Sequence, residues 1–258
     1  MTFQQLSSTL ALAGVCAFSA SVASAATVQV TFDSNIFNGS DYDNVNITHL
    51  GTAGTSLTQG TSAGRFQGTV NGYSGVPVSI FVDGLSDLYM YCYDLDEHIW
   101  GGRTVDYTIN LNGELARTLD FLGAVNSVLS QGKAYDPYAW LRPVSGNQGA
   151  AIQLGIWESK YDTSGWDLTG GSFKAEGLNT GSTAAPGTDI WWNQFKTAID
   201  GTNALDGKYV MTFEATGAQD MIAGDPPPSE VPEPGSLALL GVALAGLAAA
   251  RRHKTGAR

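Results

Sequence analysis

Two apolar segments, one near each end of the chain, confine the part that can fold in water to residues 26–230. Near the N-terminus, residues 10–18 form an apolar core, and the small residues Ala23 and Ala25 follow it. This order is typical of a secretory signal peptide. We therefore expect signal peptidase to remove residues 1–25 and the export machinery to carry the rest of the chain across the membrane.

The C-terminal segment, residues 231–258, has three parts in a fixed order. A Pro-Glu-Pro break comes first, and its prolines keep the chain extended because they cannot continue a helix. An apolar run, residues 236–250, follows as a short membrane helix that does not reach the ~20 residues of a full span. A basic pair then marks the cytoplasmic end of this run. The defining residues are Pro232, Glu233, Pro234, Arg251 and Arg252.

This tail closely resembles the PEP-CTERM sorting signal of Gram-negative bacteria. The resemblance implies that an exosortase-type enzyme in the inner membrane recognises the tail and cleaves it. It further implies a precursor anchored in the inner membrane and a product at the cell surface or in the extracellular matrix. An ordinary C-terminal anchor helix is the alternative interpretation of the same residues.

The charge of residues 26–230 narrows the choice of partners. This part carries nine Lys and Arg residues against twenty-three Asp and Glu residues. Such a surface repels nucleic acid and anionic lipid, whereas it is compatible with bound cations or with a polysaccharide matrix. We therefore expect no nucleic-acid partner.

Cysteine is nearly absent from the exported part. Cys16 lies in the predicted signal peptide, which leaves Cys92 alone, so no intramolecular disulfide can form after cleavage. A lone thiol in an oxidising compartment is explained by burial, by an intermolecular bridge or by another covalent bond.

Hydrophobic periodicity predicts a mainly β exported domain, residues 26–217, with inserted helices. Alternating segments predict strands at 27–32, 68–70, 76–82, 88–95, 104–111 and 208–215. Helical spacing predicts helices at 114–130, 147–161 and 189–199, the last capped by Thr188 or Asp189. Residues 35–64 are rich in Gly, Ser, Thr and Asn and predict weak strands at best, and residues 218–230 predict an extended Pro-rich linker.

Two residues in the predicted domain stand in motifs that carry chemistry. Cys92 lies in an aromatic-Cys-aromatic-Asp segment at the end of a predicted strand, and Gln153 lies in an apolar-Gln-x-x-apolar-Trp segment of a predicted helix. Residues 88–161 thereby resemble the thioester domains of bacterial surface proteins. The resemblance implies a β-sandwich with a helical insertion, in which Cys92 is the sulfur donor and Gln153 the acyl donor of an internal thioester. Gly155 stands where that family usually has Ala, and we expect it to open the helix without forbidding the bond.

A thioester of this kind would be a protected electrophile. A surface amine could open it and remain linked to the Gln153 acyl group, which would make the protein a covalent adhesin. Formation of the bond requires a deprotonated thiol held against the amide. Two alternatives stay open: a shared fold in which no bond forms, and ordinary packing of Cys92 and Gln153 in a core.

A run of loop residues offers a weaker candidate site. Asp94, Asp96, Glu97 and His98 could bind Ca²⁺, but they lack the spacing of a calcium-binding loop, so a solvated loop is favoured. The chain has three histidines, and His49 and His98 alone precede the tail, which argues against a His-based metal site.

Trp191 and Trp192 are candidates for stacking on a sugar ring, although such a pair on a short helix often divides between core and surface. No phosphate-binding loop or hydrolase motif is present in the sequence, so we expect no enzyme, no metal and no cofactor. Two functions remain for the exported protein. One is a covalent adhesin acting through Cys92 and Gln153 on an amine-bearing surface. The other is a passive structural or carbohydrate-binding matrix protein with the same fold and no thioester.

Overall fold

A closed barrel of six antiparallel strands forms one half of the protein. The computed structural model describes residues 25–51, 54–111 and 113–225. Around the barrel the strand order is β1-β4-β5-β9-β8-β6. The strands are β1 (Thr27–Phe32), β4 (Phe66–Ser74), β5 (Leu88–Cys92), β6 (Thr104–Asn110), β8 (Val210–Glu214) and β9 (Met221–Gly224).

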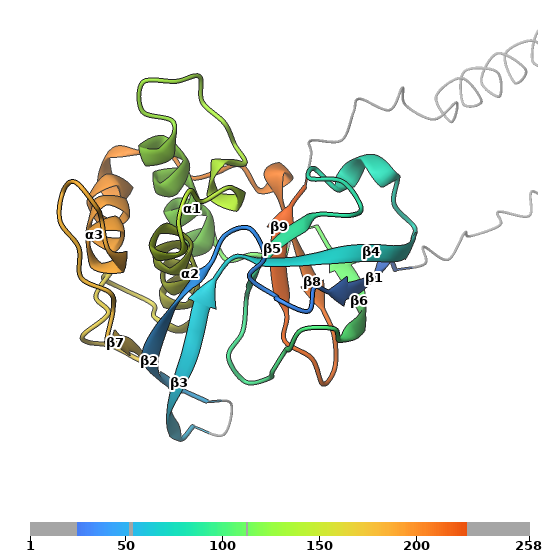
Figure 1. The fold of residues 1–258 in the computed structure, drawn as a ribbon, viewed down its shortest axis with the longest axis horizontal. Coiled ribbons are helices and arrows are strands. Elements are labelled where there is room, and N and C mark those ends of the chain that lie inside the picture. The colour runs from blue at the N-terminus through green and yellow to red at the C-terminus, as the bar shows by residue number, and fades with distance from the viewer. Residues whose placement is uncertain (1–24, 52–53, 112, 226–258) are drawn as a thin grey trace, which may run out of the picture.

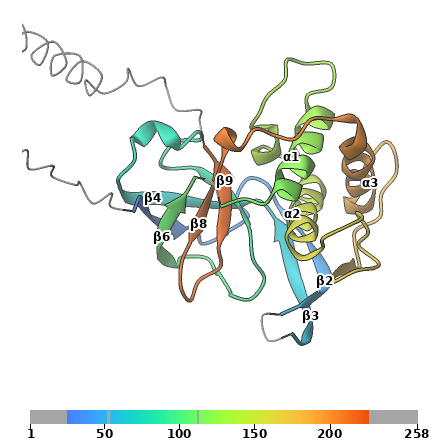
Figure 2. The same cartoon turned by 180° about the vertical axis from the view of Figure 1, so that it is seen from behind.

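The other half combines a small antiparallel sheet with three helices. The sheet has the order β3-β2-β7. Figures 1 and 2 show the helices gathered beside the barrel, with β2 and β3 next to them. These elements are β2 (Tyr42–Leu50), β3 (Ser56–Gly64), β7 (Phe173–Glu176), α1 (Ala116–Leu129), α2 (Gly146–Tyr161) and α3 (Thr188–Ala198). Short 3₁₀ turns lie at Val78–Ile80, Ala139–Leu141, Ile199–Gly201 and Gly207–Tyr209.

Helix α2 is the central element of this half. Every residue from Gln148 to Ser159 is buried, because α1, α3 and the strands β2, β3 and β7 all pack against it. Ser145 is the N-cap of the helix, and its hydroxyl accepts a hydrogen bond from the backbone N–H of Gln148. A helix buried on all sides cannot leave its polar side chains to water, so Gln153 and Glu158 must find partners inside the protein.

The mainly β character, with inserted helices, is confirmed, but the β-sandwich is wrong. The strands β1 and β6 pair with each other and close the sheet into a barrel. Closure removes the free edges that a sandwich would leave. The strand at 27–32 and the helices at 114–130 and 147–161 are confirmed to within two residues at each end.

Three local predictions are corrected. Residues 35–64 contain the two nine-residue strands β2 and β3, whose polar outward faces hid an inward row that includes Val45 and Ile47. Residues 76–82 do not form a strand: they contain a 3₁₀ turn at Val78–Ile80, which follows Pro77, a residue that supplies no backbone donor to a sheet. Residues 221–224 lie in the expected linker but form β9, a strand of the barrel that pairs with β5 and β8.

The third helix begins one residue before its predicted range. Its N-cap is Gly187, with no side-chain cap, in place of Thr188 or Asp189. Several predicted segments lie outside the described residues. They are the signal peptide 1–25 except for Ala25, the sorting tail 231–258 and, within that tail, the membrane helix 236–250. Within the described part of the chain, no helix has the length and apolar character needed to cross a bilayer.

Candidate functional site

The two residues of the predicted thioester lie in direct contact. Cys92 is the last residue of β5, and Gln153 lies near the middle of α2. The backbone N–H of Cys92 donates to Oε1 of Gln153 over 2.9 Å. In return, Nε2 of Gln153 donates to the backbone carbonyl of Cys92 over 2.7 Å. The fold therefore brings together two residues that are 61 positions apart in the sequence.

The side chain of Gln153 takes the place of a neighbouring strand at the end of β5. The ladder between β4 and β5 ends at the pair Phe66 and Met90, two residues before Cys92. On the other side of β5, the ladder to β9 continues, and Tyr93 donates to the carbonyl of Asp220. The backbone groups of Cys92 would be buried without partners on the β4 side, and the Gln153 amide satisfies both.

The thiol of Cys92 is buried and free, with an exposed fraction of 1% for the residue. Burial raises the pKa of this thiol well above its usual value, and the nearby charge of Asp94 raises it further. The resting thiol is therefore protonated at neutral pH, and in this state it is a poor nucleophile.

A cavity of about 200 Å³ lies beside the residue. Its lining includes the buried Cys92 and the exposed residue His98. Trp157, one helical turn after Gln153, also lines it, and the indole Nε1 of Trp157 has no hydrogen-bond partner among the described residues. The cavity is smaller than the ~300–1,000 Å³ of pockets for drug-sized ligands, so it suits a small amine or the tip of a side chain.

Gly155 has a packing role that the sequence did not reveal. We expected it to open the helix, but α2 runs without a break from Gly146 to Tyr161. A Cβ atom at this position would overlap the ring of Phe121 from α1. The glycine therefore allows α1 to lie close against α2, next to the turn that carries Gln153.

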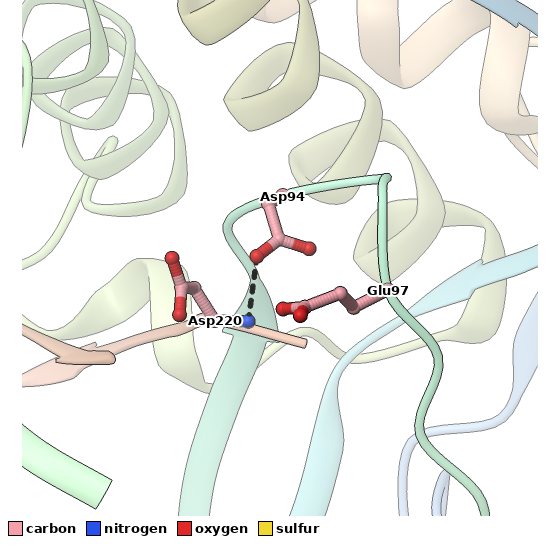
Figure 3. A group of neighbouring side chains, drawn as sticks. All are labelled: Asp94, Glu97 and Asp220. Carbon is pink, nitrogen blue, oxygen red and sulfur yellow. Dashed lines mark hydrogen bonds between the residues drawn. The ribbon is translucent and has the colours of Figure 1, made fainter. Parts of the chain in front are cut away.

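Part of the acidic loop after β5 forms a compact group with a residue from elsewhere. Carboxylate oxygens of Asp94, Glu97 and Asp220 lie within 4.8 Å of one another (Figure 3). Asp220 directly precedes β9, in the segment expected to be a linker, so no local pattern linked it to the acidic loop. Asp96 and His98 are exposed and do not belong to this group.

The predicted tryptophan pair is divided between the interior and a surface cavity. Trp192 is buried, and its ring centroid lies 6.1 Å from that of Phe121. Trp191 stacks on Phe195 at 5.8 Å and lines a cavity of about 450 Å³. Polar side chains share that lining with Trp191, namely Gln131, Asp136, Arg142, Gln148 and Gln194.

His49 is buried in β2 with its ring 5.2 Å from the ring of Tyr161. It packs as an aromatic residue, and its two ring nitrogens have no hydrogen-bond partner in the described part of the chain. Other predicted site residues lie outside the described residues, namely Ala23, Pro232, Glu233, Pro234, Arg251 and Arg252.

The tail can be compared with known proteins even though its structure is not described. Residues 230–252 match the PEP-CTERM protein-sorting motif. The chain carries a PEP-CTERM sorting signal. This confirms the prediction made from the Pro-Glu-Pro break, the apolar run and the basic pair, and it implies an exported protein processed by an exosortase. Across the whole chain, no curated protein and no solved structure matches.

Proposed function

We propose that the exported domain is a covalent attachment module that acts through an internal thioester between Cys92 and Gln153. The observation that carries the proposal is the pair of hydrogen bonds that holds the Gln153 amide against Cys92. Both polar atoms of the amide are therefore held by the residue that carries the thiol. Such proximity replaces a bimolecular encounter and can lower the barrier by several kcal/mol.

The chemistry balances without a further reactant. The Cys92 sulfur bonds to the Gln153 amide carbon, the carbon–nitrogen bond breaks, and the thiol proton leaves on the nitrogen as ammonia. The N–H of Cys92 already donates to the amide oxygen, where negative charge develops in the tetrahedral intermediate. A primary amine can then attack the thioester carbon, forming an amide with Gln153 and returning the thiol to Cys92.

The cavity beside Cys92 supports the second of these steps. Both Cys92 and the exposed residue His98 line it, so it offers space for an amine beside the residue that would carry the thioester sulfur. The unpartnered indole N–H of Trp157 lines the same cavity and could donate to an incoming polar group. The reaction would occur once per molecule, as adhesion requires, and would not be turnover.

Intact mass spectrometry of the purified protein tests the bond directly. We expect the wild type to be lighter than its sequence by one ammonia, and methylamine to convert Gln153 into an N-methylamide. The modification should map to the tryptic peptide of residues 134–160, because trypsin does not cut between Arg142 and Pro143.

The Cys92→Ala variant is the matched control. It keeps the backbone N–H and carbonyl that bind Gln153, so the fold should persist, yet it should show neither the mass loss nor the labelling. A wild-type mass equal to that of the sequence, with Cys92 alkylated only after unfolding, would overturn the proposal. In that case the Gln153 amide is a structural clamp.

The path of the protein to its target is also part of the proposal. Signal peptidase would release the N-terminal segment after export, the tail would hold the precursor in the inner membrane, and the exosortase would transfer the domain to the cell surface or matrix. The support for this path is the sorting motif together with the two apolar segments, residues 10–18 and 236–250.

A second candidate function, carbohydrate binding, is favoured by the cavity at Trp191. An aromatic face beside amide, carboxylate and guanidinium groups is suited to a sugar ring and its hydroxyls. Binding of the wild type and Trp191→Ala to a panel of bacterial polysaccharides tests it. We expect Trp191→Ala to lose binding roughly tenfold or more, whereas Cys92→Ala should bind as the wild type does. Equal binding by Trp191→Ala and wild type would exclude this cavity.

A further inference from the structure

Three carboxylates from two separate segments converge beside the end of β5. Asp94 and Glu97 belong to the loop after β5, and Asp220 belongs to the turn between β8 and β9. Each is oriented by a backbone N–H: Asp220 donates to Asp94 over 2.8 Å, Gly217 to Glu97 over 2.8 Å, and Ala215 to Asp220 over 3.1 Å. Each carboxylate therefore has one oxygen that remains for another ligand.

The free oxygen of Asp94 is the observation that points to a ligand. Asp94 is 8% exposed, and its Oδ1 is fully buried without a hydrogen-bond partner among the described residues. Figure 3 shows this oxygen on the side of Glu97, while the other oxygen accepts the bond from Asp220. A buried carboxylate oxygen with no partner costs free energy, and a bound cation would remove that cost.

The charges around the three carboxylates also bear on whether a cation binds there. Burial raises the pKa of Asp94 to about 7 and raises that of Asp220, while the positive field of Lys160 opposes this effect. The Lys160 ammonium lies over the ring of Tyr93 at 4.1 Å, and the Arg103 guanidinium donates to the carbonyl groups of His98 and Gly217. Neither cation forms an ion pair with the three carboxylates in the described part of the chain.

The candidate ligands are all oxygens, which hard cations such as calcium and magnesium prefer. Calcium accepts the irregular coordination that three carboxylates, carbonyl groups and water would provide, whereas magnesium demands near-ideal octahedral geometry. The group therefore suits calcium better than magnesium.

We propose that Asp94, Glu97 and Asp220 form a Ca²⁺ site that joins the loop after β5 to the turn between β8 and β9. Asp220 directly precedes β9, which pairs with β5 in the barrel. A bound ion would therefore hold β9 against β5, the strand that carries Cys92. The site does not depend on the thioester, and Cys92→Ala should bind Ca²⁺ as well as the wild type. The expected affinity is that of extracellular modules, with Kd on the order of 10⁻⁴ to 10⁻³ M.

Calorimetric titration of CaCl₂ into the chelator-treated full-length protein in mild detergent tests the site, with thermal melting beside it. We expect one saturable site, a higher Tm in Ca²⁺ and weaker binding of Mg²⁺. Glu97→Gln and Asp220→Asn should each weaken Ca²⁺ binding roughly tenfold or more, because each removes a charged ligand. Asp200→Asn, which neutralises an exposed acid elsewhere, should leave binding unchanged.

The Asp94→Asn variant separates a metal site from a structural role. It replaces the carboxylate whose buried Oδ1 has no hydrogen-bond partner among the described residues, so the metal-free protein should melt at the same temperature as the wild type or higher, while the Tm increase in Ca²⁺ disappears. Absence of saturable Ca²⁺ binding by the wild type at millimolar concentration would overturn the inference. Equal binding by Asp220→Asn and Asp200→Asn would overturn it as well.

Discussion

One missing methyl group determines how the two central helices meet. Gly155 lies in α2, and a Cβ there would overlap the ring of Phe121, which is fully buried and also contacts Trp166 and Phe195. The ring cannot move aside, because it is enclosed by these neighbours. The glycine at this position is therefore required by helix packing two residues from Gln153.

Gly155→Ala should destabilise the protein by about 1–3 kcal/mol, the usual range for an overpacked core. The measurement is the free energy of unfolding from urea denaturation. Gly149→Ala in the same helix is the matched control, since its Cβ would meet Pro143 at an ordinary contact distance of 3.4 Å. That variant should be neutral or more stable by up to about 1 kcal/mol, because alanine favours a helix. Equal effects at the two positions would contradict this explanation.

At the same scale, the sequence could indicate some site residues and not others. Cys92 and Gln153 were found because each stands in a recognisable local motif. The contact between them arises because the end of β5 lies against the middle of α2. Asp220 could not be found, because its neighbours Asp94 and Glu97 lie more than a hundred positions earlier. The contacts of Trp191 and Trp192 depend on which face of α3 the other helices cover, and spacing alone does not determine it.

At the scale of elements, β9 is the strand that the sequence concealed. Its four residues, Met221 to Gly224, are all buried between β5 and β8. A short apolar stretch directly before a proline-rich segment has no alternation to mark it as a strand. Conversely, long strands such as β2 were missed because their outward residues are polar, although the inward positions alternate in the usual way.

Truncation tests the importance of β9. A chain that ends after Asp225 should keep the stability of the full-length protein, because it retains every strand of the barrel. A chain that ends after Ala215 should lose about 3–6 kcal/mol of stability, because it lacks the fully buried side chains of Met221 and Ile222. That is a large part of the ~5–15 kcal/mol by which domains are stable. Urea denaturation compares the two chains, and equal midpoints would show that β9 is dispensable.

At the scale of the whole molecule, the chain builds the barrel from both of its ends. The strands β1, β4, β5 and β6 come before the helices, and β8 and β9 come after them. The central helices therefore form an insertion between two parts of one barrel (Figure 1). Periodicity could predict the strands and helices separately, but barrel closure depends on β1 pairing with β6, a contact between distant residues that no local pattern encodes.

The position of β9 has a mechanical consequence. The sorting motif begins at residue 230, only a few residues after Gly224. A tether attached to the tail would therefore pull on β9 before it pulled on any other strand, and the load would pass sideways into β5, where Met221 pairs with Cys92. A target held at Gln153 would pull on the opposite side of Cys92. Tension between an anchored cell and its target would then cross β9, β5 and α2, while β2, β3 and α3 would carry little of the force.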